Sequence, residues 1–169
     1  MRALTLTQPW ATLVALGHKR VETRSWTTYR HRDQDVAIHA AVGGFARDVA
    51  ERERELLKRE PEQIPLGAIV AIARIGKICR TQDVVQMLSG QETRLGDYTW
   101  GRWAWQLDDI RALPEPIPCR GALGLWTLPR DIEIALERMD WERKQRARQE
   151  ARTESLPMKA TEGTEGTKG

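Results

Sequence analysis

The chain has 169 residues, of which 40% are hydrophobic and 30% are charged, and its formal net charge is +3. This length predicts one domain with an appendage at most, and no segment approaches the ~18 consecutive apolar residues of a membrane-spanning helix. Because the N-terminus also lacks the apolar segment of a signal peptide, we expect a cytoplasmic protein with no membrane partner. We also favour a monomer.

Strands dominate the pattern along the chain. Short alternating or β-branched segments predict strands at residues 2–7, 36–40, 102–107 and 121–128. Residues 67–78 are too continuously apolar for a strand with one face in water, so they are the best candidate for a central strand. A segment rich in prolines, residues 114–118, is predicted to separate the last two strands.

Helices are predicted beside these strands. The first covers residues 9–16, with Pro9 in its first turn and Gly17 where a C-terminal cap belongs. A second begins after Gly43-Gly44 and ends before Pro61, with a solvated charged face. A charged C-terminal helix is predicted over residues 131–152, followed by a disordered tail over residues 153–169, where a Thr-Glu-Gly unit repeats.

The elements together predict a mainly β member of the α+β class. Several short strands with scattered helices favour a small closed or nearly closed β-barrel with peripheral helices and a C-terminal helix. The barrel would occupy residues 1–130. That segment holds 19 basic and 15 acidic residues, against 8 and 9 in residues 131–169, so the basic excess belongs to the barrel and permits a nucleic-acid partner.

Metal and cofactor chemistry finds no support in the sequence. Cys79 and Cys119 cannot form a disulfide framework and lack zinc-ligand spacing. The three histidines lack HxxxH spacing, and Gly43-Gly44 is not followed by the residues of a phosphate-binding loop. We therefore expect no metal site and no cofactor.

The segment after the first helix carries the chemistry, in the order Gly17-x-Lys19-x-x-Glu22-x-Arg24. If residues 19–24 are extended, Lys19 and Glu22 project to opposite faces. A turn or bulge between residues 17 and 20 could instead bring them together. The plainest structural interpretation is that Glu22 and Arg24 form an ion pair that closes the barrel.

This string resembles the ASCH domain family. Gln8-Pro9-Trp10 precedes it, and Ile38-His39-Ala40, Pro65-x-Gly67-Ala68-Ile69-Val70 and Gly121-x-Leu123-Gly124-Leu125-Trp126 follow it in the order typical of that family. The resemblance covers residues 3–128. It implies a PUA-like β-barrel, related to domains that bind RNA or modified bases, with a cleft beside the GxKxxExR segment.

The motif residues have chemistry that suits such a cleft. Lys19 could contact a phosphate or act as a base or nucleophile. Glu22 could accept hydrogen bonds from the edge of a base or serve in acid–base catalysis. Arg24 has a planar fork that suits a phosphate, a carboxylate or Glu22 itself. We expect the domain to bind RNA, single-stranded nucleic acid, or a modified nucleobase or nucleoside.

Four more residues are candidate ligand contacts. Trp10 is predicted at the mouth of the cleft, where it could stack on a base or plug the barrel. Trp26 begins a loop of arginines and aromatic residues that suits single-stranded nucleic acid. His39 lies in a predicted strand, as a core histidine or a catalytic one, and Tyr98 lies in a glycine-flanked loop that could form a cleft wall. Trp103 and Trp105 are predicted to pack in the core.

Two other functions stay open. Some relatives are small amidohydrolases that deacetylate an acetylated cytidine with a Lys, a Thr and a Glu; Lys19 matches that Lys, but Glu22 stands where they have the Thr. Others are described as nucleases. A metal-independent hydrolase of either kind, a nucleoside amidohydrolase or a ribonuclease, would use Lys19 and Glu22 as catalytic residues. In the remaining alternative, the C-terminal helix serves as a protein-interaction surface.

Overall fold

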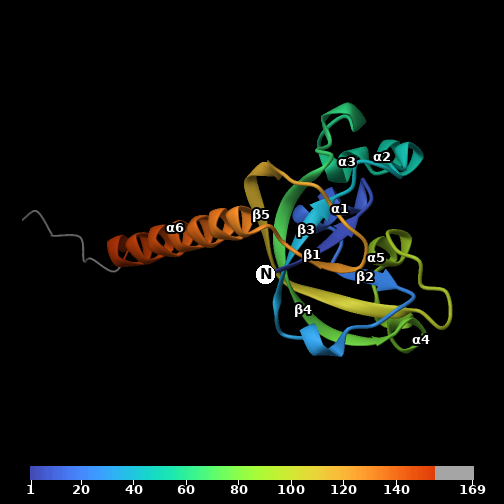
Figure 1. Cartoon of the computed structure of the whole chain (residues 1–169). Helices are drawn as coiled ribbons and strands as arrows, with labels where there is room; N and C mark the ends of the chain where they lie inside the picture. The colour runs from blue at the N-terminus through green and yellow to red at the C-terminus, as the bar shows by residue number, and fades with distance from the viewer. Residues whose placement is uncertain (155–169) are drawn as a thin grey trace, which may run out of the picture. The chain divides into compact units, whose positions relative to one another are not determined.

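A computed structural model describes residues 1–154 of the chain. Six strands form one sheet in the order β2-β5-β4-β3-β1-β6, which curls into a half-barrel with helices beside it (Figure 1). The mainly β, α+β fold expected from the sequence is thus confirmed, with β2 and β6 as the two edges of the sheet. The strands are β1 (Arg2–Leu6), β2 (Val21–Arg24), β3 (Asp35–Ala40), β4 (Ala68–Arg80), β5 (Trp103–Pro118) and β6 (Leu125–Thr127).

The chain divides by its internal contacts into two compact units. The first is Met1–Pro129 and holds the whole sheet, and the second begins at Arg130 and contains the long charged helix α6 (Arg130–Glu154). The tail predicted over residues 153–169 lies, from residue 155 on, outside the described residues.

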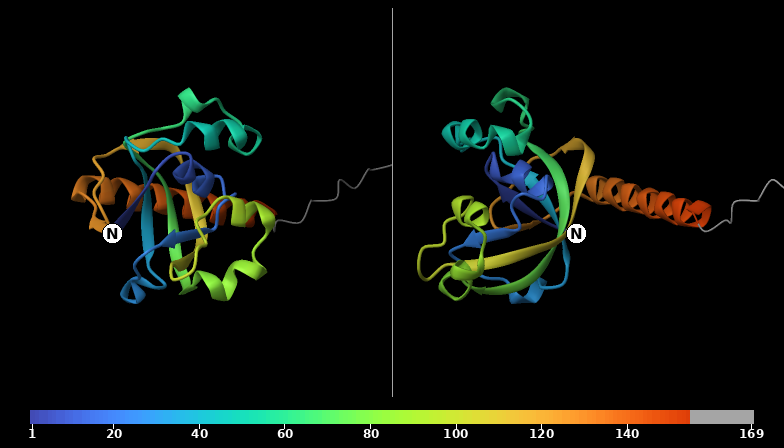
Figure 2. Two further views of the ribbon diagram at one scale, coloured as in Figure 1. Left: turned by 90° about the vertical axis from the view of Figure 1, so that its right-hand side faces the viewer. Right: turned by 180° about the vertical axis from the view of Figure 1, so that it is seen from behind.

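The centre of the sheet is built on β4, as the apolar segment predicts. β4 pairs with β3 on one side and with β5 on the other, both antiparallel. Its first six residues are all buried, because both faces of this part of the strand are covered. The curvature of β4 and β5 is visible from two further sides in Figure 2.

The first helix and its ends follow the sequence closely. α1 (Trp10–Ala15) connects β1 to the rest of the sheet, and the buried side chain of Gln8 accepts a 3.0 Å hydrogen bond from the backbone N–H of Thr12. Gly17 has φ +76°, the left-handed conformation that glycine adopts at the end of a helix without steric cost. β1 then pairs in parallel with β3.

The prediction for the proline-rich segment was wrong, because β5 runs through it to Pro118. The backbone N–H of Cys119 donates to Gly67 O at 2.9 Å, toward β4. Alternate residues face opposite sides, so the nitrogens of Pro116 and Pro118 point away from β4. Past Gln106, β5 has no paired residue in β2, so these prolines interrupt no ladder on that side.

The helix predicted after Gly44 is divided in two. α2 (Arg47–Arg52) and α3 (Arg54–Leu57) are separated at Glu53, whose buried carboxylate accepts hydrogen bonds of 2.8 and 2.9 Å from Arg94. Apolar residues of these helices pack with α1 residue Leu13 and with Leu95 in a second cluster beside the main core. The remaining helices are α4 (Thr81–Val84), α5 (Gly90–Arg94) and the 3₁₀ turns η1 (Tyr29–His31), η2 (Pro61–Gln63) and η3 (Val85–Met87).

Candidate functional site

A cleft of about 650 Å³ lies within the first unit, between the end of β1, the start of α1, β2, the segment after α5 and the loop before β6. Most of the residues predicted for the site line it. These are Trp10, Lys19, Glu22, Arg24 and Trp26. The structure thus brings together the motif after α1 and the two tryptophans that flank it in sequence.

A tight turn places Lys19 beside Glu22. The backbone N–H groups of His18 and Lys19 both donate to Leu13 O, at 2.9 and 3.1 Å, and β2 begins only at Val21. Lys19 therefore lies before the alternating strand. Its Nζ is 3.8 Å from Glu22 Oε2. Of the two conformations considered from the sequence, the turn between residues 17 and 20 is therefore present, and the fully extended segment that would separate Lys19 from Glu22 is not.

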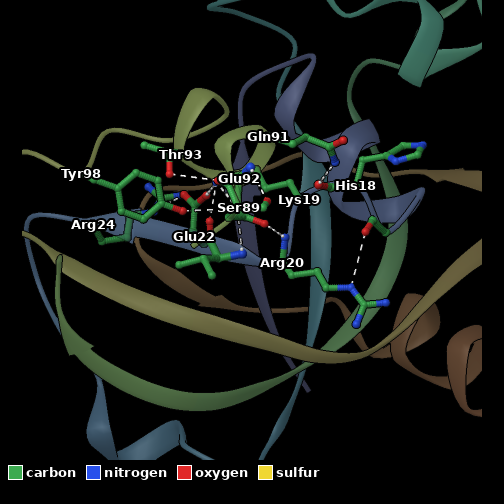
Figure 3. Close-up of polar contacts among 12 residues, drawn as sticks. His18, Lys19, Arg20, Glu22, Arg24, Ser89, Gln91, Glu92, Thr93 and Tyr98 are labelled. Atoms are coloured by element: carbon green, nitrogen blue, oxygen red, sulfur yellow. Dashed lines mark hydrogen bonds and ion pairs between the residues drawn. The ribbon is translucent and has the colours of Figure 1, made fainter. Parts of the chain in front are cut away.

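The turn is held in place by α5, as Figure 3 shows. Gln91 Nε2 donates to His18 O at 2.9 Å. The two carboxylate oxygens of Glu92 accept from the backbone N–H groups of Arg20 and Val21, at 2.8 and 3.2 Å. A side chain of α5 thereby satisfies backbone donors just where β2 begins.

Glu92 is also the second carboxylate beside the Lys19 ammonium. Its Oε1 lies 3.8 Å from Lys19 Nζ. Glu92 was not among the site residues predicted from the sequence. The spacing Ser89-x-x-Glu92 is typical of a capping box, and Ser89 Oγ does accept from Glu92 N at 3.1 Å. That pattern would have directed the carboxylate back to Ser89, whereas it contacts a turn more than seventy residues away.

The ammonium of Lys19 is buried, with the residue only 1% exposed. Its charge is compensated by Glu22 and Glu92, and Nζ donates a hydrogen bond to Val21 O. Burying a charge requires such compensation, since an isolated ion in the interior is strongly unfavourable. We call Lys19, Glu22 and Glu92 the buried charge group.

Arg24 extends this group toward β1. Its Nε lies 2.9 Å from Glu22 Oε1, and its Nη2 donates to Thr5 O at 2.8 Å. The Glu22–Arg24 ion pair that the sequence suggested is therefore present. A carboxylate has about four acceptor positions, so Glu22, at the surface of the cleft, keeps acceptor capacity for a ligand.

Two further arginines line the cleft, and neither was singled out in the sequence. Arg94 contacts the carboxylate of Glu53, as described above, and holds the pKa of Glu53 below its usual range. Arg102 Nε lies 3.3 Å from Asp97 Oδ2. Each of the four cations that line the cleft is thus beside a carboxylate, and their charges balance when Glu53 and Glu92, which lie outside the lining, are counted with Glu22 and Asp97.

Tryptophan side chains from two elements border the cleft. Trp10 opens α1 and Trp26 follows β2, and both are half-buried. The Trp26 ring packs edge-on against Trp105, with centroids 4.8 Å apart and an interplanar angle of 87°. Trp105 is fully buried, as predicted, and so anchors Trp26 at the cleft.

Tyr98 contacts the buried charge group and is not among the residues that line the cleft. Its hydroxyl donates to Glu92 Oε1 at 3.3 Å. Burial, followed by the charge of Glu92, raises the pKa of Tyr98 well above its usual range, so the phenol remains a hydrogen-bond donor. In this position Tyr98 helps to orient Glu92.

His39 lies under the loop that precedes β6. Its Nε2 is 2.9 Å from Cys119 O, and burial lowers its pKa. A Cβ on Gly121 would come within 2.4 Å of His39 Cε1, so the loop lies flat on the imidazole. The strand predicted from residue 121 begins only at Leu125. His39 supports a wall of the cleft from below and is not among its lining residues.

Metal and membrane features were searched in residues 1–154. No group of three or more His, Cys, Asp or Glu side chains in this part of the chain could hold a metal ion. None of its helices combines the length and apolarity that crossing a bilayer requires.

Comparisons with known proteins agree with this architecture. The family model described as "ASCH domain" matches residues 4–117. Crystal structures of the ASCH protein of Zymomonas mobilis and of its tyrosine-to-phenylalanine and serine-to-alanine variants share the fold, at 17% identity and TM-scores of 0.51, 0.52 and 0.52. They cover 80–82% of this chain and 92–94% of theirs. A comparison with curated protein sequences finds no match.

Proposed function

The chain belongs to the ASCH domain family, and from this premise we propose that its cleft binds RNA, single-stranded nucleic acid, or a modified nucleobase or nucleoside. The family is PUA-like and associated with RNA binding. The observation that carries the proposal is the buried charge group at the cleft, beside two half-buried tryptophans. Such a site combines a flat apolar surface with fixed hydrogen-bonding groups.

The charge balance of the cleft favours a base over a phosphate as the group that is bound. Lys19 already faces two carboxylates, and Arg24 faces Glu22. A phosphate would have to compete with these carboxylates, whereas an uncharged base would not. Trp10 and Trp26 would provide stacking surfaces. Glu22 would accept a hydrogen bond from a donor on the edge of the base.

The test is a binding screen with the full chain against natural and modified nucleosides and short single-stranded RNA and DNA. Wild type is compared with Lys19→Ala and Glu22→Gln, and Glu62→Gln serves as the matched control, because Glu62 also pairs with an arginine but is exposed. We expect a nucleoside to bind wild type and the control alike. Gln keeps an acceptor oxygen but not the charge, and a hydrogen bond to a charged acceptor contributes ~1.5–3 kcal/mol against ~1 kcal/mol for a neutral one, so Glu22→Gln should weaken binding up to about tenfold. Absence of binding to every member of the panel at low salt would refute the proposal.

A hydrolase is the second candidate, favoured by the contact between Lys19 and two carboxylates in a water-accessible cleft. In the amidohydrolase form, water adds to the acyl carbon and the C–N bond breaks, and the amine leaves with a proton supplied by Lys19 or Glu22. The same screen is therefore read for turnover of acylated nucleosides and of RNA. If Lys19→Ala keeps full turnover on a confirmed substrate, Lys19 is not the catalyst.

The second alternative, a protein-interaction module, finds support on α6. Trp141 is 62% exposed there and borders a shallow groove with Gln145 and Gln149. If this helix is an independent contact surface, Trp141→Ala should leave nucleoside binding unchanged in the screen above.

A further inference from the structure

The face of the sheet that holds the cleft continues beyond Arg24 as a row across three strands. Arg24 on β2 lies directly opposite Trp103 on β5, and Trp103 lies directly opposite Arg80 on β4. Directly opposite residues on antiparallel strands project from the same face of the sheet. The row therefore leads from a residue that lines the cleft, over Trp103, to Arg80.

Trp103 carries a second aromatic ring and a cation. The guanidinium carbon of Arg80 lies 3.8 Å from the centroid of the Trp103 ring. The Tyr29 ring meets Trp103 edge-on, with centroids 5.5 Å apart and an interplanar angle of 89°. Trp103 was predicted to be a core residue, but the structure shows it only half-buried. We call Tyr29, Arg80 and Trp103 the Trp103 stack.

The Trp103 stack is contiguous with the cleft along the chain as well as across the sheet. Trp26, which lines the cleft, packs on Trp105, and Tyr29, three residues later, packs on Trp103. Trp103 and Trp105 are two residues apart on one strand, a separation of roughly 6.6–6.8 Å. Two aromatic side chains of one loop thus lie side by side along β5.

The stack differs from the cleft in exposure and charge. Tyr29 is 54% exposed, and its neighbour Arg30 is also exposed. Arg80 contacts the Trp103 ring and donates to Gly101 O at 2.8 Å, and neither contact compensates its charge. An exposed ring beside arginines suits a single strand, because a base can stack on the ring while the cations contact the backbone.

We propose that the Trp103 stack binds the nucleotide next to the base held in the cleft, so that the ligand is a single-stranded nucleic acid and not a free nucleoside. This inference rests on the proposed function, since it takes the cleft as the site of the first base. The neighbouring base stacks on Tyr29, and Arg30 and Arg80 contact the phosphates that connect the two nucleotides.

The experiment measures affinity of the full chain for nucleosides and for homo-oligoribonucleotides of about six units, within the ~4–16 nucleotides that single-strand sites cover. Wild type should bind the oligonucleotide more tightly than the nucleoside. Tyr29→Ala should weaken oligonucleotide binding about tenfold, the effect of losing one stacked base, and leave nucleoside binding unchanged. Tyr29→Phe keeps the ring and should behave as wild type.

Controls separate this inference from the proposed function. Arg80→Gln is a second variant and should also weaken only the oligonucleotide. Trp141→Ala removes an exposed aromatic residue from α6 and should change neither affinity. If wild type binds nucleosides but Tyr29→Ala and Arg80→Gln bind oligonucleotides as wild type does, the inference fails and the proposed function stands. Equal weakening for both ligands also overturns it, and if wild type binds neither ligand both proposals fail.

Discussion

Glu22 of the buried charge group and Trp103 of the Trp103 stack project from the same face of the sheet, yet the two groups differ in how their charges are accommodated. Lys19, Glu22 and Glu92 are all buried, and their charges compensate one another at 3.8 Å. Tyr29 is exposed, and Arg80 lies on an aromatic ring. The interior tolerates charge only when it is compensated, so the first region has a fixed geometry. The second is open to solvent and can adapt to any base, since every base has a π-face.

The difference suggests that the two regions contribute differently to recognition, the first to base specificity and the second to affinity. Fixed hydrogen-bonding groups discriminate between bases, because a ligand that leaves a buried polar group unpaired is rejected. Stacking and backbone contacts add affinity with little sequence preference. Each of the following predictions measures one side of this contrast.

Glu92→Ala should have the largest effect. The variant leaves Lys19 with one carboxylate and leaves the N–H groups of Arg20 and Val21 without their acceptor. Breaking a buried ion pair from one side costs about 3–5 kcal/mol, and we expect a loss of that size in the free energy of unfolding measured with urea. Glu62→Ala, in an exposed pair with Arg47, should show no measurable loss. Equal losses would mean that burial does not distinguish the two carboxylates.

Tyr98→Phe should have a smaller effect on the same group. It removes the hydroxyl that donates to Glu92 Oε1, and the net value of such a hydrogen bond is about 1 kcal/mol, or somewhat more when the acceptor is charged. Thermal or urea unfolding measures the loss. Since Tyr98 is not among the residues that line the cleft, nucleoside affinity should change little. A large drop in affinity with unchanged stability would instead restore the direct ligand contact that the sequence suggested.

Arg30→Ala tests the charge of the exposed region. A phosphate contact on a single strand contributes about −0.7 to the slope of log affinity against log salt concentration. The variant should make the oligonucleotide slope shallower by about that amount. Between 50 and 200 mM salt, the affinity of wild type should therefore fall roughly threefold more than the affinity of the variant. Nucleoside binding should show almost no slope with either protein. An unchanged oligonucleotide slope would remove Arg30 from the binding path.

His39 is buried like Lys19, but within the part of the chain that the structure describes it has no carboxylate partner that would stabilise its charged form. Burial lowers its pKa below the usual ~6.5, so just below pH 6.5 the unfolded chain binds more protons than the folded one. The free energy of unfolding therefore falls as the pH drops from about 6.5 to the pKa of His39 in the folded protein. Above about pH 6.5, His39 makes no pH-dependent contribution. The free energy of unfolding of wild type relative to His39→Gln should change with pH only in that window. A constant difference across the window would contradict this assignment.

Local features of the fold could be predicted because their causes are local. The apolar run of β4 and the glycine after α1 each depend on residues close in sequence. The extent of β5 could not, because prolines stop a strand only where their missing N–H is needed, and which side of β5 is paired depends on the whole sheet. The partner of Glu53, at the break between α2 and α3, is likewise far along the chain, at Arg94.

For the site, the order of motifs identified the family and most residues of the cleft, since these follow one another around α1 and β2. Tertiary structure decided the rest. It brought Glu92 to Lys19, left Tyr98 and His39 outside the residues that line the cleft, and left Trp103 half-buried at the margin of the core. The physical reason is that a charge or a ring acquires its role from what compensates or covers it. Those partners come from elements that the curled sheet brings together across long stretches of chain.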